Sequence, residues 1–406
     1  MTNVCKCRLC GEESLKEFIT LGMMPIANAF LKKENIENDE YKFELNVGFC
    51  ENCKMVQLID TVDKTMMFND NYAYFSSVSK TMEDHFKKYS DLLTERFLED
   101  GDLVIEIGCN DGIMLKNFDR GKFNVFGVEP SDNVAEAARN RGLNVITNFF
   151  DQKLAEKIVN EKGKAKVIYA ANVMCHIEAF HEVVKGVKVL LKDKGVLVFE
   201  DPYIIDIIEK NAYDQIYDEH VFYFSLTSLK NFFSQYGMTI FDCERQTTHG
   251  GSMRYYVCND GDYEIKNSVS VAMKNESEKK IYKFPTYENF AENVKKSKKM
   301  LVELLNKVKS EGRRITGYAA SSKGTIVLNY CGITAKDLEY ISDNTPTKIG
   351  LYSPGMHIPI VSEKEFHENP PDYAILLAWN YAKEIKEKEK ESGVKFIVHI
   401  PFARVI

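Results

Sequence analysis

The middle of this sequence alternates apolar runs of strand length with helical patterns. The runs are DLVIEIG (102–108), FNVFGVE (123–129), KVIYAAN (166–172) and GVLVFED (195–201), and a helical stretch surrounds residues 180–191. Such alternation is typical of a parallel sheet with helices on both faces. We therefore expect an α/β domain over residues 71–265.

The flanking regions differ in pattern. The chain has 406 residues, more than a single core of ordinary size, so further domains are expected. Residues 1–70 hold cysteine pairs and short strand-like pieces at 41–49 and 54–58. An amphipathic helix around 290–308 leads into a second α/β series within 266–406, with RITGYAAS, a helix from about Thr325, LEYISD, YAILLAW and VKFIVHI.

Charge and hydropathy limit the partners. The chain has 53 basic and 60 acidic residues and a formal charge of −7, which disfavours bulk electrostatic binding to nucleic acid or anionic membranes. No apolar run approaches the roughly 20 residues that span a bilayer, and the start of the chain has no signal-peptide core. We expect a cytoplasmic protein with neither nucleic-acid nor membrane partners.

Two C-x-x-C pairs near the start predict a structural zinc site. Each pair can offer two thiolates to one ion, and four thiolates leave no open position for catalysis. Two independent reducing pairs are the alternative, and Cys5 is left over. The expected ligands are Cys7, Cys10, Cys50 and Cys53.

The loop EIGCNDGIML (106–115) follows the first strand and is predicted to open a helix. Gly108 and Gly112 let the backbone approach a ligand, Glu106 could face a cationic group, and Glu129 could accept both ribose hydroxyls. The loop lacks the third glycine of a dinucleotide fingerprint and the lysine of a P-loop. It therefore favours S-adenosylmethionine, with a purely structural glycine turn as the alternative.

The segment IYDEHVFYFS (216–225) follows the fifth strand and can fold over the carboxyl ends of the sheet. His176, after the fourth strand, would point to the same place. Histidines beside a methyl donor could remove a proton near neutral pH. Alternatively, the aromatic residues simply pack and His176 starts a helix. The candidates in the segment are Tyr217, Glu219, His220 and Tyr223.

Over essentially its whole length, the chain resembles the three-domain C-methyltransferases that act on nucleotide-linked keto-deoxysugars. The shared motifs include C-R-L-C-G, N-Y-A-Y-F-S-S-V-S, E-I-G-C-N-D-G, N-V-M-C-H-I, I-Y-D-E-H-V-F-Y-F-S, H-G-G-S-M-R, Y-A-A-S-S-K-G and P-G-M-H-I-P-I. The resemblance implies a zinc-binding domain (1–70), a Rossmann-like class I methyltransferase domain (71–265) and a C-terminal Rossmann-like α/β domain (266–406) that helps to bind the nucleotide-sugar. A monomer is expected.

The resemblance also implies roles for individual residues. His220 becomes the general base, with Tyr217 and Glu219 as neighbours, His176 as a second polar contact, and Tyr72 or Tyr74 reaching in from the N-terminal side. The sequence departs from the family at Asp218, where a second histidine is common. The implied cofactor contacts are Glu106, Gly108, Asn110, Asp111, Gly112, Glu129, Pro130, Asn148, Phe149, Asn172 and Val173.

The nucleotide-sugar is expected to be linked to thymidine diphosphate. Ser321 and Lys323 lie where GYAASSKG opens a helix, and a helix N-terminus with a lysine suits a diphosphate. Arg254 is a second candidate for that charge, and Tyr223 for a sugar contact. Lys323 could equally be a solvated lysine. Trp379, the single tryptophan, is expected to pack rather than to bind ligand.

Three functions are compatible with these residues. The first is methylation of the carbon beside a ketone, after His220 removes its proton. The second keeps the donor but methylates a hydroxyl of a sugar or small molecule. The third is a zinc-anchored binding module without catalysis. Exchange of the acceptor's α-proton with deuterated solvent separates the first two, because only the carbon route forms an enolate.

Overall fold

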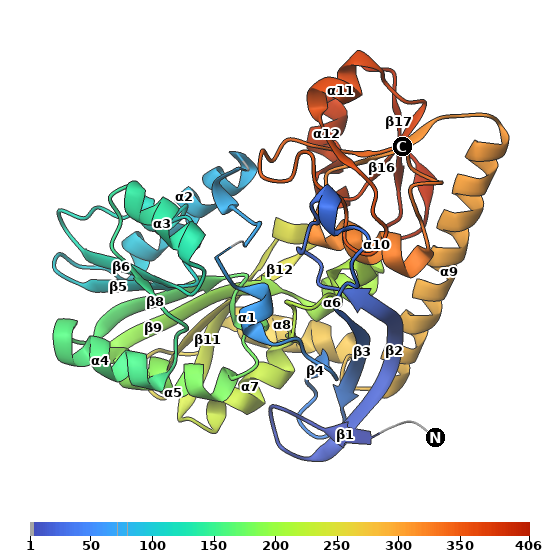
Figure 1. The fold of residues 1–406 in the computed structure, drawn as a ribbon. Coiled ribbons are helices and arrows are strands. Elements are labelled where there is room, and N and C mark those ends of the chain that lie inside the picture. Colours follow the sequence, from blue (N-terminus) through green and yellow to red (C-terminus); the bar gives the residue numbers. More distant parts are fainter. Residues whose placement is uncertain (1–3, 71, 79) are drawn as a thin grey trace.

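The computed structural model describes residues 4–70, 72–78 and 80–406. Asn71 and Ser79 of the N-Y-A-Y-F-S-S-V-S motif lie outside the described residues. Within them, the chain forms three sheets that follow the three predicted units. The blue strands of the first unit lie between the green central unit and the long orange helix along the edge of the molecule (Figure 1).

The N-terminal sheet is antiparallel, in the order β1-β2-β3-β4-β10. Its last strand comes from the IYDEHVFYFS segment (216–225) of the central unit, with Phe222 opposite Gln57 and Tyr223 opposite Val56. The segment that carries His220 is therefore fixed to the first unit. The strands are β1 (Val4–Lys6), β2 (Glu13–Pro25), β3 (Lys42–Cys50), β4 (Val56–Leu58) and β10 (Phe222–Tyr223).

The central sheet has the order β11-β12-β9-β8-β5-β6-β7. Strands β5 to β9 run parallel, as the sequence predicts, and β12 lies antiparallel between β9 and β11. The strands are β5 (Leu103–Ile107), β6 (Asn124–Glu129), β7 (Val145–Thr147), β8 (Ala165–Ala171), β9 (Leu191–Pro202), β11 (Met238–Gln246) and β12 (Ser252–Asn259).

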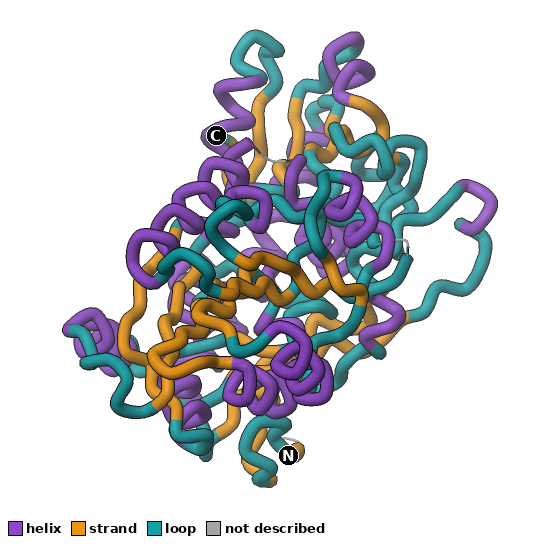
Figure 2. The backbone as a smooth tube through the Cα atoms, turned by 90° about the vertical axis from the view of Figure 1, so that its left-hand side faces the viewer, coloured by secondary structure: helices purple, strands orange, loops and turns teal. Residues whose placement is uncertain are grey.

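Helices cover both faces of this sheet. Phe86 and Leu93 of α2 pack with Val104 on one face, whereas Ile158 of α4 and Val184 of α5 pack with Ile105 on the other. Figure 2 shows strands running through the middle of the molecule with helices around them. The helices of this unit are α2 (Lys80–Phe97), α3 (Asp132–Asn140), α4 (Gln152–Lys162), α5 (Phe180–Leu190), α6 (Ile204–Lys210) and α7 (Leu226–Ser234), and α1 (Lys64–Met67) precedes them.

The prediction of a helix directly after the glycine loop is wrong. Only a single 3₁₀ turn, η3 (Leu115–Asn117), forms there. Asn110 and Gly112 have positive φ angles of 49° and 78°, which a right-handed helix does not accommodate. The side-chain amide of Asn110 instead accepts a hydrogen bond from the Ser76 backbone N–H and donates one to the Tyr74 carbonyl oxygen.

The C-terminal unit contains a six-stranded sheet of order β15-β14-β13-β16-β17-β18, parallel except for β18. The predicted helix from about Thr325 begins earlier, at Ser322, because the Ser321 hydroxyl caps the Gly324 amide at 3.1 Å. Among the described residues, no helix combines the length and apolar character needed to cross a membrane. The strands are β13 (Ile315–Tyr318), β14 (Ile341–Asp343), β15 (Ile360–Ser362), β16 (Tyr373–Leu376), β17 (Lys395–Val398) and β18 (Arg404–Val405). The helices are α8 (Asn267–Glu278), α9 (Phe284–Ser310), α10 (Ser322–Cys331), α11 (Glu363–Glu368) and α12 (Ala382–Lys388).

Candidate active site and zinc centre

A cavity of about 700 Å³ lies where the three units meet. Its wall includes Asn28 from the first unit, loops after the parallel strands of the central unit, and residues 319–323 from the third. Parallel sheets present ligand sites beyond the carboxyl ends of their strands, so this is the expected place for chemistry. The volume falls in the range of small-molecule sites.

One arm of the cavity is built around Gly108 and Glu129. A Cβ on Gly108 would lie 2.4 Å from Val173, so only glycine fits. The Glu129 carboxylate accepts the backbone amides of Asn110 (2.9 Å) and Ser131 (3.0 Å), which fixes its direction, and burial raises its pKa. This geometry fits a ribose of S-adenosylmethionine. The predicted cofactor residues in the wall are Gly108, Asn110, Glu129, Pro130, Asn148, Phe149, Asn172 and Val173.

Three predicted cofactor residues lie outside the cavity wall. Glu106 shares a face of β5 with Val104, so its carboxylate turns toward α2 and accepts the Tyr169 hydroxyl at 2.8 Å. Burial raises the pKa of Glu106 well above its ordinary value. Asp111 is buried in an ion pair with Arg141. The third residue, Gly112, permits the turn, since a Cβ there would lie 2.2 Å from Leu143.

His220 is held by the backbone. Its Nδ1 lies 2.8 Å from the carbonyl oxygen of Gln215. A carbonyl only accepts, so Nδ1 carries the hydrogen and Nε2 of the neutral ring is the acceptor. Burial, followed by the positive potentials of His176 and Lys323, lowers the pKa of His220 well below its ordinary value. The ring is therefore neutral and able to accept a proton at neutral pH.

Aromatic rings flank this imidazole. The Tyr217 centroid lies 4.1 Å from that of His220, and the His176 centroid lies 5.2 Å from it. Burial lowers the pKa of His176 to about 3, and its Nε2 has no hydrogen-bond partner among the described residues. Burial also keeps the Tyr217 hydroxyl protonated by raising its pKa. Both side chains can therefore act as neutral hydrogen-bonding groups.

Glu219 ties the segment to the first unit. Its carboxylate accepts the Asn28 amide at 2.6 Å and the Tyr72 hydroxyl at 3.1 Å, and burial raises its pKa. Tyr74 also lines the cavity but is exposed. Asn28 was missed by sequence reasoning, because an isolated loop asparagine carries no pattern. Asp218 accepts the amide of Ala27 at 3.0 Å and does not line the cavity.

Two buried lysines face the cavity from the third unit. Lys323, at the start of α10 beside Ser321, donates to the carbonyl oxygen of His249 at 3.1 Å, and burial lowers its pKa to about 8. Lys348 donates to the carbonyl oxygen of Ala320 at 2.8 Å, and burial lowers its pKa too. No sequence pattern marks Lys348. Together they provide positive charge beside a helix N-terminus.

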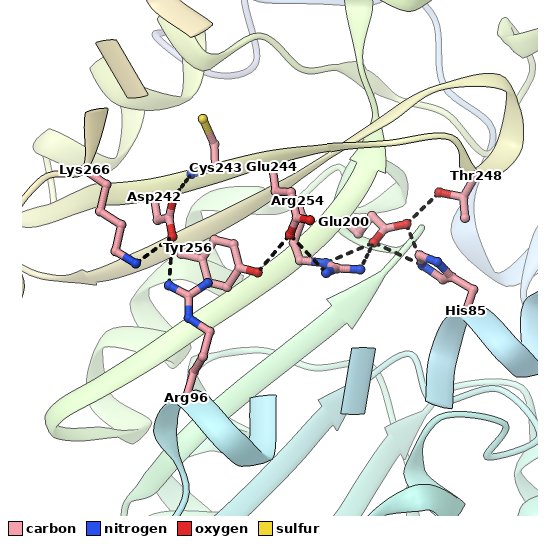
Figure 3. A network of polar contacts seen from close by, with 10 residues as sticks. All are labelled: His85, Arg96, Glu200, Asp242, Cys243, Glu244, Thr248, Arg254, Tyr256 and Lys266. Carbon is pink, nitrogen blue, oxygen red and sulfur yellow. Dashed lines mark hydrogen bonds and ion pairs between the residues drawn. The ribbon is translucent and has the colours of Figure 1, made fainter. Parts of the chain in front are cut away.

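Arg254 and Tyr223, both expected at the nucleotide-sugar, do not line the cavity. Figure 3 shows Arg254 between Glu200 and Glu244, at 2.8 and 3.4 Å. His85 completes the cluster on the opposite side of Glu200. Arg254 is placed there because β12 pairs with β9, setting Arg254 opposite Glu200. Tyr223 is buried in β10.

The two cysteine pairs converge. The Cys7 and Cys53 sulfurs lie 3.6 Å apart, as do those of Cys10 and Cys50, and all four lie within 4.8 Å. Zn–S bonds of about 2.3 Å place tetrahedral sulfurs about 3.8 Å apart, so the group fits Zn²⁺. Gln57 donates to the Cys7 sulfur at 2.9 Å. The spare thiol, that of Cys5, is not in the group.

A second group of potential ligand atoms lies at the edge of the cavity, which His176 and His220 line. One atom each of Cys175, His176 and His220 lies within 4.8 Å of the others. The thiol and imidazoles are ligands suited to a soft divalent ion. Such an ion would occupy the nitrogen of His220 that otherwise accepts a proton.

Comparison with known proteins covers nearly the whole chain. Residues 7–68 match a zinc binding domain model, residues 82–242 a "Methyltransferase domain", and residues 247–401 a "C-methyltransferase C-terminal domain". C-methyltransferase NovU of Streptomyces niveus is 35% identical over 406 residues, covering 99% of this chain and 96% of its own.

Solved structures match part of the chain. Magnesium protoporphyrin IX methyltransferase from Synechocystis PCC 6803, with bound SAM, is 13% identical with a TM-score of 0.34, covering 44% of this chain and 79% of that one. The PH0226 protein from Pyrococcus horikoshii OT3 is 14% identical with a TM-score of 0.37, covering 50% of this chain and all of that one.

Proposed function

Because the chain belongs to the family of S-adenosylmethionine-dependent C-methyltransferases, we propose that it methylates the carbon beside the ketone of a nucleotide-diphosphate keto-deoxysugar, with His220 as general base. The family match to carbon transfer sets aside the hydroxyl-methylating alternative and the non-catalytic one. The four cysteines hold a structural Zn²⁺.

One observation carries the proposed base. The Gln215 carbonyl holds the hydrogen of His220 on Nδ1, which leaves Nε2 as an acceptor in the cavity wall. Among the described residues, the hydrogen bond recorded for that ring goes to the Gln215 carbonyl and not to a carboxylate, and burial keeps the ring neutral. A positioned general base contributes about 10² to 10⁴ in rate.

The residues around His220 support an enolate route. When bound, S-adenosylmethionine supplies a methyl group on a cationic sulfur. His220 Nε2 takes the proton from the substrate carbon, and the C–H electrons move into the carbonyl to form an enolate. Tyr217 and His176 stabilise the enolate oxygen by hydrogen bonding. The enolate carbon could then accept the methyl group, with the sulfur leaving as a neutral thioether, and the proton on His220 would leave to solvent.

We assign the diphosphate to the third unit. Lys323 and Lys348 supply charge, and the backbone amides after Ser321 begin α10, where a phosphate is stabilised by unpaired N–H groups. The thymidine base and a monomeric state come from the resemblance of the sequence. The methyl is expected on the carbon next to a 4-ketone.

The test uses the intact zinc-loaded protein and enzymatically prepared thymidine-diphosphate 4-keto-6-deoxyhexoses. Without S-adenosylmethionine, wild type should exchange the α-proton with deuterated solvent, and with it should add one methyl to carbon. The His220→Asn variant should lose both by about 10² to 10⁴ while retaining S-adenosylhomocysteine affinity. The His367→Asn variant is the matched control, since His367 lies outside the cavity wall. Wild-type exchange in His220→Asn would remove His220 from the base role.

A further inference from the structure

The carbonyl that orients His220 belongs to a turn held from another unit. Gln215 ends the 3₁₀ helix η5 (Tyr213–Gln215) of the central unit. Its neighbour Asp214 is fully buried and accepts the indole N–H of Trp379 at 2.6 Å. The same carboxylate oxygen lies 3.2 Å from Nε2 of His399. Both partners come from the C-terminal unit.

The same indole also supports a second turn of the cavity wall. A Cβ on Gly250 would lie 2.8 Å from the Trp379 ring, so the ring packs directly on this glycine. Gly250 ends η6 (Thr248–Gly250), and the Gln215 side-chain amide donates to the carbonyl of His249 in that turn. Trp379 therefore contacts both backbone segments beside the imidazole.

Asp214 itself does not line the cavity. Its second oxygen, Oδ1, has no hydrogen-bond partner among the described residues. A buried carboxylate is costly without charge-assisted hydrogen bonds, and here both come from Trp379 and His399. The conformation of η5 is thus tied to docking of the C-terminal unit.

We propose that Asp214 is a positioning residue that couples docking of the C-terminal unit, through Trp379 and His399, to the orientation of the His220 imidazole. The inference rests on the proposed base role of His220. It extends that role, because a residue without contact to either substrate determines whether Nε2 points at the carbon. Displacements of about 1 Å at a reacting group can cost as much as 10²-fold in rate.

The variants separate this coupling from general packing. Trp379→Phe removes the N–H donor together with the outer ring atoms that contact Gly250, whereas Asp214→Asn keeps the indole and removes the carboxylate. Tyr330→Phe is the matched control, because the Tyr330 ring packs on Tyr213 of the same turn, with centroids 5.6 Å apart, whereas the hydrogen bonds recorded for the Asp214 carboxylate go to Trp379 and His399. We expect about 10-fold lower kcat and α-proton exchange in the first two, with S-adenosylhomocysteine affinity within about twofold. The KM should stay within about twofold in Trp379→Phe, which keeps the Asp214 carboxylate that raises the pKa of Lys323.

A second readout needs no substrate. Long-range ¹H–¹⁵N spectra of labelled protein, with His220 assigned by His220→Asn, should show Nδ1 protonated and its proton slow to exchange. In Trp379→Phe that exchange should accelerate at least about 10-fold, because η5 opens more often. Tyr330→Phe should retain the wild-type rate. Trp379 is the only tryptophan of the sequence, so its fluorescence emission reports directly on the contact between Trp379 and the turn that carries Asp214.

The outcomes are distinguishable. Unchanged Nδ1–H exchange and unchanged kcat in Trp379→Phe would overturn the coupling, whatever the acceptor proves to be. If His220→Asn keeps full activity while Trp379→Phe still accelerates Nδ1–H exchange, the base role fails and the coupling survives. If Asp214→Asn does not fold, Trp379→Phe with a wild-type circular dichroism spectrum decides the question.

Discussion

Burial determines which form each reacting side chain takes. Low-dielectric surroundings favour the neutral form, so the pKa falls for His220, His176 and Lys323 and rises for Glu219. Both imidazoles are thereby neutral at neutral pH, and in the described part of the chain the hydrogen bond recorded for His220 goes to a backbone carbonyl. Lys323 retains its charge at neutral pH but loses it in mildly alkaline solution.

The pH dependence of the base follows from this burial. Since the pKa of His220 lies well below its ordinary value, the neutral ring persists as the pH falls. We expect kcat to stay level between pH 7.5 and about 6.5, the ordinary pKa of histidine, and to fall only below it. His176, Lys323 and His249 all act in this direction. A half-maximal rate at pH 6.5 or above would contradict the prediction.

Lys323 gives a second pH prediction, on the alkaline side. Its pKa is lowered to about 8, so its charge is present below that pH and disappears above it. The KM for the nucleotide-sugar should therefore rise between pH 7 and 9. Lys323→Arg keeps the charge throughout this range and should remove the dependence. Initial rates at fixed saturating S-adenosylmethionine give the KM of wild type and of Lys323→Arg at each pH. An equal rise of KM with pH in the two proteins would contradict a phosphate contact.

At the scale of elements, one short strand links the zinc centre to the segment that carries the proposed base. Gln57 of β4 donates to the Cys7 sulfur and lies opposite Phe222 of β10, two residues after His220. The Leu58 amide also donates to the Val221 carbonyl at 2.9 Å. Zinc binding at the cysteines therefore supports β4, which pairs with the strand that directly follows the proposed base.

Loss of the zinc should consequently reduce methyl transfer more than it reduces S-adenosylhomocysteine affinity. In Cys50→Ser we expect zinc below one per chain and methyl transfer reduced at least about 10-fold, because zinc binding contributes folding energy to the first unit. S-adenosylhomocysteine affinity should change less than about threefold, since the predicted cofactor arm belongs to the central sheet. Cys5→Ser should retain one zinc by elemental analysis. Equal zinc in both variants would refute the ligand set.

At the scale of the molecule, the cavity exists only because three units close around it. Asn28 from the first unit meets Glu219 from the central one. The Thr325 hydroxyl of the third unit donates to the carbonyl of Ala27 at 2.9 Å. These two hydrogen bonds join residues 191 and 298 positions apart in sequence. The units therefore act as parts of one site.

Removing one of these bonds should loosen that assembly. Thr325→Val keeps the shape but leaves the Ala27 carbonyl without a donor, at a cost of about 1 to 3 kcal/mol. We expect a lower denaturation midpoint in urea and a higher KM for the nucleotide-sugar. Thr325→Ser retains the hydroxyl and should remain close to wild type. Identical midpoints for the valine and serine variants would show that the bond does not contribute.

The sequence by itself determined the α/β units, the zinc ligands and the segment holding the proposed base. These depend on local patterns: strand-length apolar runs, C-x-x-C spacing and clustered polar residues. Only the tertiary structure placed Glu106 away from the cavity and paired Arg254 with Glu200. It alone brought Asn28 and Lys348 into the wall. Side-chain direction and cross-unit contacts depend on strand register and domain docking, which no local pattern encodes.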